Sequence, residues 1–205
     1  MTVAIVDFGM CNLDSVSRGI EACGGVPLVT DRPAEIVAAD RIVLPGVGAF
    51  TDAMTNLRRR SLDDALSEAV IEQGVPCLGI CLGMQLMASR GLEGGEMEGL
   101  GWIEGEIRRF ESEDRTIRVP HVGWNAVDVE TDGPLFRDIP SGTDFYFVHS
   151  FHFVCADRAD VVGMTTYCGR FVSAVSRGHI HGVQFHAEKS QRWGLQVLRN
   201  FLALR

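Results

Sequence analysis

Residues 75–85 read Val-Pro-Cys-Leu-Gly-Ile-Cys-Leu-Gly-Met-Gln, and this stretch decides the fold. Its first half is almost entirely apolar, as in a parallel strand that is covered on both faces. Gly79 and Gly83 flank Cys81 at the point where the strand pattern changes to a helical one. A nucleophile between two such glycines, at a strand-to-helix turn, is the pattern of a nucleophile elbow. We therefore expect a parallel α/β sheet with Cys81 at the carboxyl end of one strand.

Each residue type in this pattern meets a physical need. The turn is strained and leaves no room for side chains two residues before or after the nucleophile, so Gly79 and Gly83 supply that room. Amides at the start of the following helix favour a thiolate and can bind an oxyanion. The alternative interpretation is that Cys81 is a small core residue, the common role of a free cysteine and the one we expect for Cys77.

The chain before this stretch alternates strand and helix signals. Strands are predicted at 2–6, 26–29 and 41–44, and helices at 13–23 and 62–73. Asn12 is placed to cap the first helix, and the basic run at 58–60 suits the end of another. This β-α-β-α-β order implies parallel strands joined by right-handed crossovers.

The second half is richer in strands. Residues 91–105 read as a loop, and strands are predicted at 102–110, 118–129, 145–148, 161–166, 171–175 and 180–184. An amphipathic helix at about 192–204 closes the chain. The predicted fold class is α/β, with a flavodoxin-like, mostly parallel sheet flanked by helices and an antiparallel β addition in the second half.

Two residues near the end of the chain suit the roles of base and orienting acid. His186 and Glu188 follow the strand predicted at 180–184, at the same carboxyl edge as Cys81. In an extended stretch, residues two apart point the same way. A thiol nucleophile needs a base, and the base needs an orienting acceptor. The other five histidines compete for the role; of these, we expect His179 and His181 to be surface or structural residues.

A second loop at this edge carries Gly46, Val47 and Gly48 after the strand at 41–44. Its glycines let backbone N–H groups approach a substrate closely. Such donors stabilise the oxyanion of acyl transfer by ~3 kcal/mol each. A plain strand-to-helix turn is the alternative.

The composition narrows the class of protein. With 205 residues, 46% of them hydrophobic and 22% charged, the chain suits one domain over 1–205. Its net charge of -8 and the absence of a basic face exclude an ordinary nucleic-acid binder. No membrane span or signal peptide is predicted. The six cysteines form no C-x-x-C pair, so we expect a reduced, cytoplasmic protein without a metal or cofactor.

Six strings in the chain carry a resemblance to a known family. They lie at 5–13, 44–50, 78–86, 120–125, 146–150 and 182–191. Together they resemble the class I (triad) glutamine amidotransferases, and within these the glutaminase subunits of imidazole glycerol phosphate synthase. The strings span essentially the whole chain in the order of the family.

The resemblance implies roles for named residues. Cys81 would attack the side-chain amide of glutamine, His186 would shuttle the proton, and Glu188 would orient His186. The loop at 46–48 and Leu82 would serve the oxyanion and substrate through their backbones. The remaining positions implied are Gln85, His149 and Ser150 for glutamine, and Trp124, Asn125, Tyr146 and Lys189 near the partner interface.

The resemblance also implies a heterodimer with a HisF-type (β/α)₈ cyclase, to which ammonia would pass. There it would join a phosphoribulosyl substrate, giving imidazole glycerol phosphate and an aminoimidazole carboxamide ribotide in histidine biosynthesis. The family's oxyanion loop rests in a misoriented state, which ligand in the cyclase would correct. Weak basal glutaminase activity that rises strongly with the partner is therefore expected.

Three positions depart from the family pattern. Ala187 stands where the family usually has Pro, and Cys11 stands where it usually has Gly. The sequence Phe-His-Phe at 151–153 is also not the commonest one in the family. The main alternative is a paralogous glutaminase that supplies ammonia for amino-sugar and surface polysaccharide synthesis. Two others are a different thiol hydrolase, such as a γ-glutamyl hydrolase or cysteine peptidase, and a non-catalytic scaffold.

Overall fold

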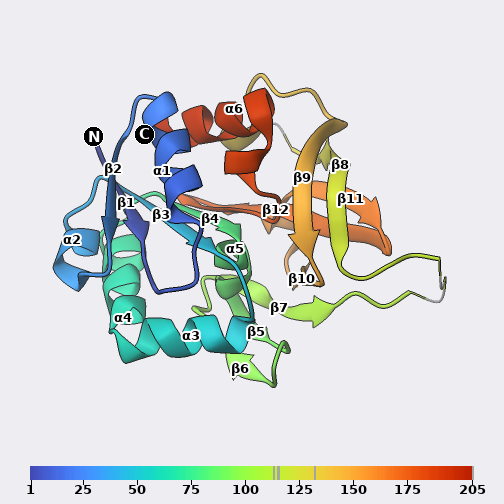
Figure 1. Cartoon of the computed structure of the whole chain (residues 1–205), viewed down its shortest axis with the longest axis horizontal. Helices are drawn as coiled ribbons and strands as arrows, with labels where there is room; N and C mark the ends of the chain where they lie inside the picture. The colour runs from blue at the N-terminus through green and yellow to red at the C-terminus, as the bar shows by residue number, and fades with distance from the viewer. Residues whose placement is uncertain (113, 115, 132, 205) are drawn as a thin grey trace.

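Parallel strands form the centre of the molecule (Figure 1). The computed structural model describes residues 1–112, 114, 116–131 and 133–204. Within these residues, the parallel strands lie in the order β2-β1-β3-β4-β13. Their bounds are β1 (Thr2–Val6), β2 (Val26–Thr30), β3 (Arg41–Gly46), β4 (Cys77–Cys81) and β13 (Ile180–Val183). This is the parallel sheet that the apolar runs predicted.

Helices cover both faces of these strands (Figure 1). On one face lie α1 (Leu13–Ala22) and α6 (Gln191–Leu202). On the other lie α2 (Pro33–Val37), α3 (Phe50–Arg59), α4 (Leu62–Ser67) and α5 (Leu82–Leu86). The result is a three-layer sandwich, the arrangement expected for parallel strands joined through helices.

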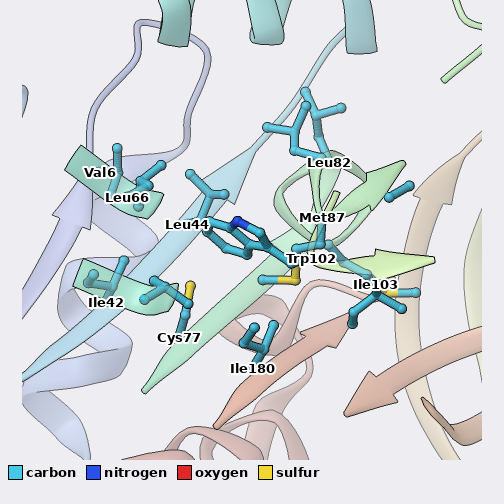
Figure 2. Packing of buried hydrophobic residues seen from close by; sticks show 14 of the residues in the cluster. Val6, Ile42, Leu44, Leu66, Cys77, Leu82, Met87, Trp102, Ile103 and Ile180 are labelled. Atoms are coloured by element: carbon cyan, nitrogen blue, oxygen red, sulfur yellow. The ribbon is translucent and has the colours of Figure 1, made fainter. Parts of the chain in front are cut away.

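Two hydrophobic cores follow from the alternation of side chains along each strand. On β3, Ile42 and Leu44 pack into the core beneath α3 and α4, whereas Val43 packs into the core beneath α1 and α6. Figure 2 shows part of the first core, in which Leu66 and Trp102 pack beside these strand residues. Because both faces are buried, the strands are apolar throughout, and this is why they could be recognised in the sequence.

The second half extends the sheet with mostly antiparallel strands. The bounds are β5 (Ala88–Gly91), β6 (Met97–Glu98), β7 (Ile103–Arg109), β8 (His121–Val129), β9 (Thr143–His149), β10 (Phe151–Cys155), β11 (Val161–Tyr167) and β12 (Gly169–Arg177). The sheet continues as β13-β12-β10-β7-β5-β6, and β11, β8 and β9 branch from β12. Short 3₁₀ turns lie at Pro134–Phe136, Arg158–Asp160 and Ala187–Lys189. The predicted fold class, with its antiparallel addition, is confirmed.

Several local predictions were wrong. The helix predicted over 62–73 is α-helical only to Ser67 and continues as a π-helical turn over Glu68–Glu72. The predicted loop at 91–105 contains β6, because Met97 and Glu98 pair with β5, whereas β7 falls within the strand predicted at 102–110. Asn12 precedes α1 but makes no capping hydrogen bond with its side chain.

The carboxyl edge of the parallel strands gathers the segments of interest. Gly46 at the end of β3 pairs with Cys81 at the end of β4, and Val183 of β13 pairs with Ile80. The chain leaves these ends toward Val47, Leu82 and His186 respectively. Ligands of open α/β sheets bind outside this edge, so the topology places a candidate site here.

Candidate active site

Cys81 occupies a strained backbone turn between β4 and α5. Its φ and ψ are 55° and -111°, values that a side chain with a Cβ rarely adopts. A Cβ on Gly83 would lie 1.7 Å from the carbonyl oxygen of Leu44, and one on Gly79 would lie 2.7 Å from backbone atoms of Gly83. Both glycines are therefore required by close backbone approach, and the predicted elbow is present.

His186 and Glu188 form a buried pair. His186 Nδ1 lies 2.8 Å from Glu188 Oε1, and the two side chains are 5% and 2% exposed. Because a carboxylate can only accept, Nδ1 donates to Glu188, and Nε2 is the ring nitrogen left to contact Cys81. The reason predicted for their proximity was wrong. Glu188 lies in the 3₁₀ turn over Ala187–Lys189 and folds back onto His186, rather than following it in an extended stretch.

The surroundings of His186 set its charge. Burial disfavours the charged imidazolium, but hydrogen bonds with Cys81 and Glu188 outweigh it and raise the pKa of His186 to about 9. A protonated His186 places a positive charge beside the sulfur of Cys81. The ring is held by its backbone as well, because His186 N–H donates to the carbonyl of Tyr146 at 2.9 Å. The backbone contact and the Glu188 contact therefore hold the imidazole in one orientation.

A cavity of about 200 Å³ opens beside the sulfur. This size suits an amino acid rather than a larger ligand. A larger hollow of about 870 Å³ lies elsewhere, but its lining includes no cysteine or histidine among the described residues. The lining of the smaller cavity is Val47, Gly48, Cys81, Leu82, Gln85, Glu93, Val148, His149, Ser150, Phe151, His186 and Lys189. Chemistry rather than size therefore identifies the site.

The loop over 46–48 borders this cavity but does not present the amide of Val47 to it. Val47 N–H donates to the carbonyl oxygen of Met10 at 2.8 Å. Gly48 has a φ of +103°, which favours glycine. Cys11 reaches the same loop, since its Sγ lies 3.4 Å from the carbonyl oxygen of Pro45. The structure thus places Val47 and Gly48 in the lining of the cavity, with the Val47 amide engaged elsewhere, whereas Gly46 is the buried last residue of β3 and pairs with Cys81.

Gln85 is fixed with its carbonyl oxygen available. Its Nε2 donates to the carbonyl of Phe151 at 3.0 Å and to Gln184 Oε1 at 2.9 Å. An amide nitrogen has two hydrogens, so both are used within the protein. The atom that Gln85 can offer to a ligand in the cavity is therefore Oε1, an acceptor.

The structure adds Glu93 to the site, a residue that sequence reasoning missed. It accepts a hydrogen bond from the Phe50 amide at 3.1 Å, and burial raises the pKa of its carboxyl. Glu93 lies in the segment predicted to be a loop, twelve residues after Cys81 and without a motif of its own. Only tertiary contact brings it to the cavity.

His149 and Ser150 line the cavity, but the His149 ring belongs to a buried network. Its Nδ1 donates to the carbonyl of Phe151 at 2.8 Å, and its Nε2 lies 3.0 Å from His121 Nδ1. The predicted structural roles of His179 and His181 are consistent with their contacts, to Val70 and Ser176 respectively. His149 is thus available to a ligand mainly through its backbone.

The four residues expected near a partner do not share one face. Trp124 and Tyr146 pair across β8 and β9, with ring centroids 5.9 Å apart, and Trp124 is 48% exposed. Asn125, the next residue, turns the other way and donates from Nδ2 to the carbonyl of Thr166 at 2.9 Å. Lys189 is exposed at the cavity. Trp124 and Tyr146 thus form a surface, whereas Asn125 lies beneath it.

Comparisons with known proteins agree with this geometry. The family model for glutamine amidotransferase class-I matches residues 4–204. The chain is 51% identical over 199 residues to the imidazole glycerol phosphate synthase subunit HisH of Moorella thermoacetica, covering 97% of this chain and 93% of the relative. It is 45% identical over 202 residues to subunit HisH 1 of Campylobacter jejuni, covering 98% and 100%.

Solved structures show the same fold at low sequence identity. A chain in the structure of PurLQS from Thermotoga maritima aligns with a TM-score of 0.76 and 19% identity, covering 98% of this chain and 97% of that one. A crystal structure described as a glutamine amidotransferase aligns with a TM-score of 0.76 and 16% identity, covering 98% and 96%. Together with the sequence relatives, these matches mean that the chain belongs to the class-I glutamine amidotransferases and, within that family, to the HisH subunits of imidazole glycerol phosphate synthase.

Proposed function

We propose that Cys81, His186 and Glu188 are the catalytic triad of a glutaminase. The observation that carries the proposal is the His186–Glu188 pair, 2.8 Å apart, beside a cysteine on a strained elbow. Family membership makes the chain the glutaminase subunit of imidazole glycerol phosphate synthase in histidine biosynthesis. The assignment of the triad rests on the chemistry of these side chains.

The reaction follows from the protonation states. The Cys81 thiolate attacks the side-chain carbonyl carbon of glutamine and forms a C–S bond. Protonated His186 gives its proton to the leaving nitrogen as the C–N bond breaks, releasing ammonia. His186, now neutral, takes a proton from water, which attacks the thioester and yields glutamate and free Cys81. Glu188 holds the imidazole in the orientation that both steps need.

The substrate would be held through complementary charge and acceptors. The carboxylate of Glu93 and Oε1 of Gln85 suit the ammonium group of an amino acid. The backbone at His149 and Ser150 suits the α-carboxylate of the same amino acid. Leu82 N–H and an amide of the 46–48 loop would hold the oxyanion. For Val47 to contribute, its peptide must turn and leave the carbonyl of Met10.

The relatives are named as subunits, which implies a second subunit. We infer that it is a HisF-type (β/α)₈ cyclase that forms a heterodimer over the surface of Trp124 and Tyr146, with Lys189 at its edge and Asn125 supporting it. Ammonia would pass to this partner and join the phosphoribulosyl substrate. A ligand in the cyclase would raise glutaminase activity if it bound more tightly when the 46–48 loop is turned, with the Val47 amide free of Met10. The increase would follow the ratio of the ligand's affinities for the turned and unturned states.

We further propose that residues 1–205 form one glutaminase domain that acts in the cytoplasm. No helix in the described part of the chain is long and apolar enough to cross a membrane.

The test measures glutamate release by the purified chain, with and without the cyclase and its phosphoribulosyl substrate. We expect weak basal activity, strong stimulation by partner plus ligand, and loss of both in Cys81→Ala. Cys81-dependent glutamate release at the same rate with and without the cyclase would contradict the proposed partner. No Cys81-dependent release under any condition would contradict the triad.

A further inference from the structure

Gln184 is a buried polar residue that the proposed mechanism does not use. It follows β13 and is 0% exposed. Its Nε2 lies 3.6 Å from Sγ of Cys81. A buried amide must satisfy its hydrogen-bonding groups within the protein, so the identity of its partners defines its role.

The neighbouring contacts determine which end of this amide faces the sulfur. The carbonyl oxygen of Phe151 can only accept, and it receives Gln85 Nε2 at 3.0 Å. The orientation of the Gln85 amide is therefore set, and its second hydrogen points to the Gln184 amide at 2.9 Å. The Gln184 atom at that contact must be Oε1, an acceptor. Nε2 of Gln184 is consequently the end directed at Cys81.

We propose that Gln184 is a further catalytic residue, which donates an N–H to the thiolate of Cys81. The inference rests on the proposed glutaminase function. A thiolate accepts hydrogen bonds better than a thiol does, so a donor fixed against Sγ favours the charged form and holds the sulfur in place. Gln85 acts behind it as a positioning residue, because it holds the Gln184 amide in the donating orientation.

The sulfur of Cys81 has two polar contacts, one of which suits the neutral thiol and the other the charged thiolate. The carbonyl oxygen of Val148 lies 3.9 Å from Sγ and can accept only from the neutral thiol. Gln184 Nε2 can donate only to a lone pair, and it does so most strongly when sulfur is charged. The other titratable groups around Cys81 are His186 with Glu188 behind it, Glu93 and Lys189 in the cavity, and His149 on β9.

The experiment measures how the alkylation rate of Cys81 by iodoacetamide depends on pH, followed on the Cys81 peptide by mass spectrometry. Gln184→Met keeps the length of the side chain and removes the donor. We expect the midpoint of its alkylation profile to rise by about one pH unit, and its kcat to fall about tenfold to a hundredfold. The KM for glutamine should change much less.

Ser173→Ala is the matched control. Ser173 is also 0% exposed, and its carbonyl accepts from the backbone N–H of Gln184. Its hydroxyl makes no hydrogen bond to Gln184 or Cys81 within the described residues. Its profile should match that of the native chain. Gln85→Met is the second variant, in case Gln184→Met does not fold. It frees the Gln184 amide and should raise the midpoint by a smaller amount.

Two results would overturn the inference: a folded Gln184→Met with the native alkylation profile, or the same upward shift in Ser173→Ala. If Gln184→Met does not fold, a native profile in Gln85→Met overturns it. Alkylation of Cys81 needs no glutamine turnover, so it tests the role of Gln184 independently of the proposed glutaminase function. A native chain without glutaminase activity contradicts the proposed function, whereas an unshifted midpoint contradicts the role of Gln184.

Discussion

At the scale of single residues, a network of neutral histidines beneath β8 makes the molecule sensitive to acid. His149 Nδ1 donates to Phe151, so its Nε2 must accept from His121 Nδ1, 3.0 Å away. Nε2 of His121 then accepts from Asn125 at 3.2 Å. Protonation of His121 or His149 would bring two donors face to face. Burial accordingly lowers the pKa of His121 to about 4 and that of His149 to about 3.

The sign of the pH dependence follows from these values. Between pH 6.5, the ordinary histidine value, and about 4, the unfolded chain binds protons at these positions and the folded chain does not. The free energy of unfolding should therefore fall as the pH drops through this window, by about 1 kcal/mol per pH unit for each histidine. Urea unfolding at pH 7 and pH 5 measures it.

The control for this prediction is His179→Gln, which lies outside the network and should keep the same steepness. His121→Gln should be less stable at pH 7 but should lose less stability on acidification. Equal slopes for the native chain and His121→Gln would mean that the network does not titrate on unfolding.

At the scale of elements, the loop between β3 and α3 is held by the segment before α1. Met10 accepts the Val47 amide, and the Cys11 thiol donates to the carbonyl of Pro45. Burial raises the pKa of Cys11 to about 11, so at neutral pH it remains a thiol and a donor. The cysteine adds one contact that holds the loop with the Val47 amide turned away.

Cys11→Gly should therefore raise basal glutaminase activity. The loss of one weak hydrogen bond of up to ~1 kcal/mol would increase the turned population by up to about fivefold. Cys11→Ser, which keeps a donor, should remain close to the native rate. The measurement is glutamate release without the partner; an unchanged or lower rate in Cys11→Gly would show that the thiol does not hold the loop.

Elements also show what could be predicted from the sequence. The parallel strands were recognised because two buried faces leave a continuous apolar run, and the elbow because Gly79 and Gly83 have a local steric cause. The 3₁₀ turn at Glu188 is a local turn in which Glu188 pairs with His186, two residues earlier, and no hydrophobic periodicity records it. Glu93 escaped because a single polar residue carries no pattern, whereas Gln184 lies within the string at 182–191 but was assigned no role from it. Only the assembled sheet brings them to Cys81.

At the scale of the whole molecule, an apolar surface borders the active-site cavity. Val122 and Trp124 on β8 pair with Val148 and Tyr146 on β9, and the first three are exposed. Val148 also lines the cavity, so the surface and the site are continuous. A partner seated there would shield the cavity from water and receive ammonia directly, which is what the proposed heterodimer requires.

Trp124→Ala should weaken binding of the cyclase, because a large exposed aromatic at the centre of an interface commonly contributes about 2 kcal/mol or more. Titration calorimetry should show a Kd at least about tenfold higher, with the thermal midpoint of the free chain little changed. Ile71→Ala is the matched control. Ile71 is 52% exposed but precedes β4, at the edge opposite the elbow, and its loss should leave the Kd unchanged. If the Kd changed equally with both substitutions, or with neither, the partner would bind on another face. Ammonia would then not be delivered across the β8–β9 surface.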